Sequence, residues 1–330
     1  MMRVHESSTG RCRRLVLSMG VLWMLSAGAA RAEEASGQKT FAKPEEAIRA
    51  LVAAAKKDDS ADMIAILGPD ADKVVSSGDP IADAADRKWF VAAASARTAF
   101  EKLGDDRVIA QVGRDAWPMP IPLVKSGDTW RFDTKAGVDE LLNRRIGRNE
   151  LTAISVAHAF VDAQREYAAK DRTGSGAGVY AQKVASEPGK RDGLYWEATS
   201  DADRSPLGPL VADASTEGYA PVQGGEGPRP YHGYYYRILT SQGAAAPGGA
   251  RSYVKDGQMT GGFALVAYPA EYRVSGIMTF IVGPQVIVFQ KDLGEKTEEL
   301  GKAMTAYDPD DTWVPARETP PAPLPKAGPS

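Results

Sequence analysis

The stretch GGFALVAYPAEYRVSGIMTFIVGPQVIVFQKDLG (261–294) is the most apolar and most strand-like part of the chain. Two runs, Phe263–Tyr268 and Ile277–Val282, are rich in the β-branched and aromatic residues that favour strands. A third run, Val286–Gln290, follows after only Gly283-Pro284-Gln285, a spacing typical of a β-hairpin. We therefore predict three strands of one antiparallel sheet that forms the wall of the larger core.

The segment Glu150–Lys170 is predicted to be the helix that this sheet covers. It carries two apolar stripes at helical spacing, Leu151, Ile154, Ala157 and Val161 on one side and Val156, Phe160, Ala163 and Tyr167 on the other. A helix that is apolar on most sides is buried against more than one partner. Gly147 is expected to end a short preceding helix, Val138–Arg145, and Asn149 to cap the long one. We expect the sheet to wrap this helix, with Phe160 near the centre of the domain.

The region before this helix is predicted to be a separate α+β module. Helices are expected at about 44–56, up to Leu67 and at 81–103, and strands at 107–112, 120–125 and 129–133. In the C-terminal domain, after the long helix, a short helix is expected at 179–185. Helices followed by a small sheet, with a W-x-F-D closing strand, resemble the cone-shaped fold of nuclear transport factor 2 and ketosteroid isomerase. That resemblance implies a pocket, for which the candidate lining residues are Trp89, Trp117 and Trp130 and the candidate acids Asp115 and Asp133.

Residues 1–32 have the pattern of a secretory signal peptide. Its parts are the basic residues Arg11, Arg13 and Arg14, the apolar run Leu15–Leu25 and the cleavage sequence Ala30-Arg31-Ala32. We expect a mature chain that begins at Glu33, is periplasmic or secreted, and contains no later run of membrane-spanning length. Cys12 is the only cysteine, so cleavage removes any disulfide or thiolate site. The expected parts are the signal peptide at 1–32, the N-terminal module at 41–146, the C-terminal domain at 147–314 and a proline-rich disordered tail at 315–330.

Composition and motifs argue against several classes of function. The formal net charge of −3 disfavours a nucleic-acid partner, which needs a basic surface. No Gly-x-Ser-x-Gly elbow and no dinucleotide-binding glycine motif follows a strand. The two histidines of the mature chain, His158 and His232, are too few for a zinc site without cysteine. We predict no catalytic residue, no metal site and no cofactor.

Six blocks are similar to a bacterial family. They are KRDGLYW (190–196), SPLGPLV (205–211), PYHGYYYRILTSQG (230–243), GGFALVAYPAEY (261–272), SGIMTFIV (275–282) and QKDLG (290–294). These blocks resemble the domain-of-unknown-function family 2950, which implies an exported envelope protein of Gram-negative bacteria and lends no catalytic residues.

A looser resemblance concerns the C-terminal domain alone. It rests on Gln164, Tyr167, Ala168, Tyr234, Tyr236, Ala267, Pro269, Gly276, Phe280 and Val282. The long helix, the aromatic strand and the following hairpin resemble the globular part of type IV pilins and pseudopilins. Here a whole module precedes the helix, where pilins place a cleavable leader and an apolar half-helix.

The candidate binding residues belong to an aromatic group with a few polar neighbours. They are Tyr195, Trp196, Tyr231, His232, Tyr234, Tyr236 and Arg237. Strand alternation places Tyr234 and Tyr236 on one face and Tyr235 on the other. A surface of tyrosine and tryptophan suits contact with an envelope protein, a peptide or a glycan, although the same aromatics could simply fill the core. We predict a non-enzymatic binding or structural role through this surface. The alternative is small-molecule binding or hydrolysis in a pocket of the N-terminal module.

Overall fold

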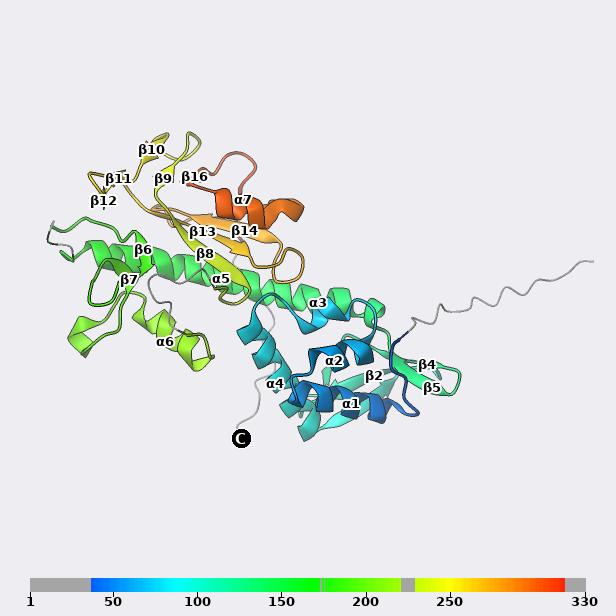
Figure 1. The fold of residues 1–330 in the computed structure, drawn as a ribbon. Helices are drawn as coiled ribbons and strands as arrows, with labels where there is room; N and C mark the ends of the chain where they lie inside the picture. The colour runs from blue at the N-terminus through cyan, green and yellow to red at the C-terminus, as the bar shows by residue number, and fades with distance from the viewer. Residues whose placement is uncertain (1–36, 173, 175, 221–228, 318–330) are drawn as a thin grey trace, which may run out of the picture. The chain divides into compact units, whose positions relative to one another are not determined.

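The computed structural model describes residues 37–172, 174, 176–220 and 229–317, which form an α+β protein as predicted (Figure 1). The predicted signal peptide and the tail from residue 318 lie outside these residues. None of the described helices has both the length and the apolar character needed to span a bilayer.

The N-terminal part has four helices followed by a small antiparallel sheet. The helices are α1 (Pro44–Lys56), α2 (Ser60–Leu67), α3 (Ala71–Val75) and α4 (Pro80–Ala96). The strands are β1 (Thr98–Lys102), β2 (Arg107–Val112), β3 (Trp117–Pro118), β4 (Leu123–Ser126) and β5 (Thr129–Phe132), in the order β1-β2-β4-β5 with β3 paired to β2. The helices and the sheet enclose a core of their own, which includes Leu51, Ile66, Leu123 and Phe132.

One helix prediction in this part is too long. The helix expected to reach Leu103 ends at Ala96, and Phe100 lies in β1, where it pairs with Ala110 of β2. Arg97 is already extended at the helix C-cap. The apolar spacing continues past this point, but the pairing with β2 decides the conformation, and spacing along the chain does not reveal pairing.

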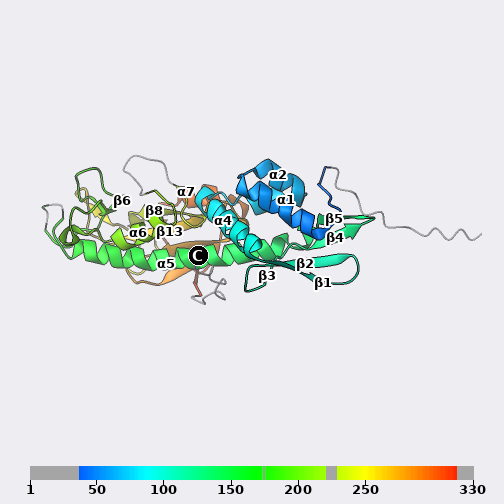
Figure 2. The same cartoon turned by 90° about the horizontal axis from the view of Figure 1, so that it is seen from below.

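Helix α5 (Val138–Ala168) continues without a break from the N-terminal part into the C-terminal part (Figures 1 and 2). The prediction of two helices separated at Gly147 is therefore wrong. Gly147 lies inside α5, after the 3-10 turn η1 (Thr134–Ala136) and well before the helix end. A glycine in a helix interior costs about 1 kcal/mol, which tertiary packing on both sides of this point offsets. Asn149 is buried in the helix and caps nothing, because its Nδ2 donates to the Ser275 carbonyl at 2.8 Å.

The C-terminal sheet is built as predicted around the three strands of the 261–294 stretch. Its order is β17-β15-β14-β13-β8, with every neighbouring pair antiparallel. The strands are β8 (Tyr234–Leu239), β13 (Ala264–Pro269), β14 (Met278–Val282), β15 (Val288–Asp292) and β17 (Val314–Pro315). Val314 and Pro315 thus pair with β15, so the start of the expected disordered tail belongs to the sheet.

The sheet lies between α5 and the short helix α7 (Thr297–Ala303), as Figures 1 and 2 show from two sides. Every residue of β13 is buried between them. Phe160, in the C-terminal half of α5, is 2 % exposed and meets the ring of Phe263 edge-on at 5.8 Å. The predicted central position of Phe160 is confirmed.

The remaining segments form short elements around the sheet. They are β6 (Lys183–Ala185), β7 (Gly193–Tyr195), η2 (Asp201–Asp203), α6 (Gly208–Thr216), β9 (Ser241–Gln242), β10 (Arg251–Ser252), β11 (Val254–Lys255), β12 (Gln258–Met259), η3 (Gly294–Lys296) and β16 (Ala306–Tyr307). The helix expected at 179–185 is absent from these described residues. The fully buried side-chain amide of Gln164 instead holds the backbone of Ala181, because its Nε2 donates to the Ala181 carbonyl and its Oε1 accepts the Ala181 amide.

Candidate functional site

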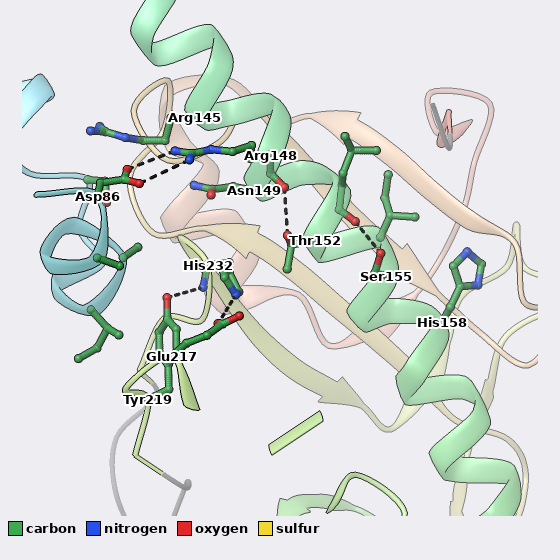
Figure 3. Close-up of a pocket in the computed structure, with 16 residues that line it drawn as sticks. Asp86, Arg145, Arg148, Asn149, Thr152, Ser155, His158, Glu217, Tyr219 and His232 are labelled. Atoms are coloured by element: carbon green, nitrogen blue, oxygen red, sulfur yellow. Dashed lines mark hydrogen bonds and ion pairs between the residues drawn. The ribbon is translucent and has the colours of Figure 1, made fainter. Parts of the chain in front are cut away.

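A groove of about 760 Å³ lies between α4, α5 and the segments that carry Tyr219 and His232 (Figure 3). We call it the α4–α5 groove. Helix α5 lines it with side chains one turn apart, among them Arg148, Thr152 and Ser155. The hydroxyls of Thr152 and Ser155 donate back to carbonyls of their own helix, as serine and threonine commonly do in helices.

Asp79 holds one end of this groove together. Its side chain is 1 % exposed, and Oδ1 accepts the amide protons of Ile81 and Ala82 at the N-terminus of α4. Oδ2 accepts the Tyr219 hydroxyl and the Gly233 amide, both at 2.9 Å. One carboxylate therefore caps a helix of the N-terminal part and ties down two segments of the C-terminal part.

His232 and Gly233 form a tight turn beside this carboxylate. Both have left-handed backbone conformations, with φ of 48° and 73°. A Cβ atom on Gly233 would lie 2.5 Å from Asn149 Nδ2, so only glycine fits here. The turn directs His232 Nε2 to the carboxylate of Glu217 at 2.8 Å, while its amide donates to the Tyr219 hydroxyl. Burial, followed by the charge of Asp79, raises the pKa of Tyr219, so its hydroxyl stays a proton donor to that carboxylate.

Two arginines of α5 lie where the groove meets a second cavity. Arg148 pairs with both carboxylate oxygens of Asp86 on α4, at 3.2 and 3.4 Å. Arg145 is 6 % exposed and donates to the carbonyls of Lys73 and Val74 at 2.7 and 2.8 Å, at the C-terminal end of α3. Burial lowers the pKa of Arg145. Both arginines and Asp86 line the groove and the second cavity alike.

The second cavity, of about 390 Å³, lies inside the N-terminal part, and we call it the apolar pocket. Its walls come from all four N-terminal helices, the loops near β3 and the start of α5. The apolar lining is Leu51, Ala55, Met63, Leu67, Val74, Val75, Ala85, Trp89, Phe90, Trp117, Met119, Pro120, Ile121 and Leu141. Trp89 and Trp117 meet edge to face at 5.1 Å, a favourable aromatic geometry. Its size falls in the usual range for small-molecule sites.

The charged residues of the apolar pocket are four arginines and two aspartates. Arg87 pairs with Asp58 at 2.8 Å, and Arg144 pairs with Glu140 at 2.7 Å while lying over the Trp117 ring at 5.4 Å. Asp83 accepts the amide and the hydroxyl of Ser77. Burial raises the pKa of the Asp83 carboxyl, although these hydrogen bonds and the charge of Arg145 act in the opposite direction.

The structure distributes the predicted aromatic site over three places. Tyr231, His232 and Tyr236 lie together with Tyr219, with the Tyr219 and Tyr231 rings 4.8 Å apart. Trp196 is buried elsewhere, with the guanidinium groups of Arg172 and Arg191 over its ring at 4.8 and 5.1 Å, and Tyr195 is its half-buried neighbour in β7.

Tyr234 and Arg237 belong to the sheet rather than to a surface. Tyr234 is fully buried against Phe280, with its hydroxyl donating to the Met278 carbonyl. Arg237 donates to the Gly301 and Met304 carbonyls at the end of α7. Tyr235 stacks on Tyr268, which lies against Gly301 of α7, so the predicted alternation along β8 agrees with these contacts.

Of the residues predicted for a pocket in the N-terminal module, Trp89 and Trp117 line it. Trp130 lies instead beside Phe41, which bridges to it, and neither Asp115 nor Asp133 is among the described lining residues. Sequence reasoning missed Asp79, Tyr219 and Arg145. The sequence Asp79-Pro80 is a recognisable helix start, but nothing local marks the partners of the other two.

Within the described residues, no group of three or more His, Cys, Asp or Glu is placed to hold a metal ion. A family model described as "Protein of unknown function (DUF2950)" matches residues 38–316, which span both cavities and every sheet. The chain belongs to this family. The resemblance of the six blocks is thereby confirmed, and the family description supplies no activity. Comparison with curated proteins and with solved structures found no match.

Proposed function

We propose that this member of the DUF2950 family binds a small, largely apolar molecule in the apolar pocket. The observation that carries the proposal is the pocket itself, an apolar space of about 390 Å³ with an edge-to-face tryptophan pair in its wall. Each methylene group that a ligand buries there contributes about 0.8 kcal/mol. A rigid pocket formed by helices, strands and tryptophans loses little entropy on binding.

The chemistry of the lining favours binding over hydrolysis. Among the described residues of the apolar pocket there is no serine, threonine, cysteine, histidine, lysine or tyrosine. The two carboxylates are already engaged, Asp83 with Ser77 and Asp86 with Arg148. A general base needs to be within reach of the proton that it abstracts, and both carboxylates are held by other partners.

The setting that we propose is the envelope of a Gram-negative bacterium. The signal-peptide pattern at 1–32 and the family resemblance support export to the periplasm or beyond. A periplasmic binding protein without enzymatic activity agrees with an apolar pocket that lies next to the α4–α5 groove and shares Asp86, Arg145 and Arg148 with it.

The test is a titration with a fluorescent apolar probe, with a matched pair of variants. Ala55→Phe places a ring in the pocket, whereas Ala54, its neighbour on α1, is 2 % exposed and is not among the pocket residues. Ala55→Phe should abolish probe binding with little loss of stability. Ala54→Phe should instead destabilise the protein by about 1–3 kcal/mol through overpacking. Equal probe binding by wild type and Ala55→Phe would show that the pocket is not the site.

A second candidate is a contact with a protein, a peptide or a glycan through the aromatic residues beside the groove. Tyr231 and His232 are only half-buried, and among the described residues of the predicted aromatic site His232 lines the α4–α5 groove, where Tyr219 lies beside both rings. A pilin-like C-terminal domain is the architecture that we propose for this role, supported by α5 packed under an antiparallel sheet. Tyr231→Ala should weaken binding of such a partner and leave probe binding in the apolar pocket unchanged.

A further inference from the structure

The charged residues around the apolar pocket indicate that its ligand also carries a charged group. This inference rests on the proposed function. The pocket has four arginines in its lining and two aspartates. Arg87 and Arg144 each have an acidic partner outside the pocket, Asp58 and Glu140. Arg148 is paired with Asp86. Arg145 is the remaining arginine of the pocket, and its hydrogen bonds go to backbone carbonyls.

Arg145 is a buried guanidinium whose hydrogen-bond partners are neutral. It is 6 % exposed, and its two hydrogen bonds go to the backbone carbonyls of Lys73 and Val74. Among the described residues, no carboxylate oxygen lies within salt-bridge distance of it. Buried charges in proteins are normally paired with an opposite charge. A guanidinium has five N–H donors, so donors remain for a further acceptor.

The two carboxylates that attract Arg145 most strongly from a distance, Asp83 and Asp86, are hydrogen-bonded to other groups, and Glu271 adds a smaller attraction. Asp83 accepts two hydrogen bonds from Ser77. Asp86 is held by both terminal nitrogens of Arg148, and this pair is partly exposed at the junction of the two cavities. The junction therefore has a cation without a contacting anion directly beside an apolar wall.

We propose that the ligand is an amphipathic anion with a single carboxylate, such as a medium-chain fatty acid. Its apolar body occupies the space lined by Met63, Trp89 and Trp117. Its carboxylate lies at the junction with the α4–α5 groove, where it accepts hydrogen bonds from Arg145, with Arg148 as the second guanidinium in reach. Arginine suits this role because its planar fork matches a carboxylate in two-point contact.

The test compares three ligands that share one chain and differ in the head group: octanoate, 1-octanol and octylammonium. Each displaces the fluorescent apolar probe from wild-type protein at neutral pH. Octanoate should bind at least about tenfold more tightly than 1-octanol, the gain expected for hydrogen bonds to a charged group. Octylammonium should bind most weakly. Lengthening octanoate by one methylene should strengthen binding about fourfold.

Variants test whether the preference for octanoate arises at the junction of the apolar pocket and the α4–α5 groove. Arg145→Gln should remove most of the preference for octanoate while 1-octanol binds as before, and Arg148→Gln should reduce it partly. Arg97→Gln is the control, because Arg97 is an exposed arginine of the same part that lines neither cavity. If Arg145→Gln does not fold, the wild-type comparison and Arg148→Gln still decide the outcome.

The outcomes separate this inference from the function on which it rests. Equal binding of octanoate and 1-octanol, or tighter binding of octylammonium, would overturn the anionic head group and leave the apolar pocket standing as a binding site. Failure of all three ligands to displace the probe would overturn the proposed function, and the inference with it. A preference for octanoate that survives both Arg145→Gln and Arg148→Gln would place the head group elsewhere.

Discussion

Asp79→Ala should be strongly destabilising, because this buried carboxylate accepts four hydrogen bonds. The change removes the cap of α4, which is worth about 1 kcal/mol. It also leaves the Tyr219 hydroxyl and the buried Gly233 amide without their acceptor. A buried donor without a partner costs about 1–3 kcal/mol. The expected loss is therefore about 3–7 kcal/mol, which corresponds to a fall of roughly 10 °C in the melting temperature for a protein of this size.

The chain offers a matched control for the capping part of this loss. Asp59 caps α2 by accepting the Asp62 amide at 2.9 Å and has no second role in the described contacts. Asp59→Ala should cost only about 1 kcal/mol. Tyr219→Phe removes one of the two additional partners, and a double-mutant cycle with Asp79→Ala should show coupling of about 1 kcal/mol.

The assay is thermal unfolding followed by tryptophan fluorescence, with circular dichroism as a second probe. A single cooperative transition in wild type that separates into two in Asp79→Ala would support the proposed division of the chain near residues 145–149. If Asp79→Ala melts no lower than Asp59→Ala, the carboxylate does not join the two parts, and this account of the groove is wrong.

Three further predictions concern the core, the chain start and the long helix. Phe160→Ala should cost about 3–5 kcal/mol, whereas His158→Ala should cost less and leave probe binding intact; equal melting of the two variants would contradict the central place of Phe160 under the sheet. Mass spectrometry of exported protein should find Glu33 as the first residue, and an intact N-terminus would contradict export with cleavage. Limited proteolysis should spare residues 145–149, because they lie inside α5 with Arg145 and Asn149 buried; early cleavage there would mean that the helix opens at Gly147.

The sequence predicts the C-terminal sheet well because its signals are local. The apolar runs of β13 and β14 and the short turn before β15 need no knowledge of distant residues, although β15 begins at Val288 rather than at the predicted Val286, which lies in the turn with φ of 69°. The errors occur where a distant partner decides. Phe100 is in a strand because β2 lies beside it, and Ala181 lies outside any helix, where the side chain of Gln164 holds its backbone. Gly147 stays helical because both parts of the protein pack against α5.

The candidate site was harder to predict for the same reason. Asp79 is recognisable as a helix cap, but its other partners are 140 and 154 residues away. The sequence around Arg145 gives no local sign of burial, because its hydrogen bonds go to the carbonyls of Lys73 and Val74 in α3. Trp89 and Trp117 could be proposed as pocket residues from the layout of the module, whereas the charged junction depends entirely on how α4 and α5 meet.

The most direct test of the central claim is a crystal structure of the protein grown with octanoate. The account predicts density for the ligand chain in the apolar pocket beside Met63, Trp89 and Trp117, with the carboxylate directed towards Arg145. A pocket closed by its own side chains, with octanoate bound only at the outer surface, would contradict the claim that this protein binds small apolar molecules there.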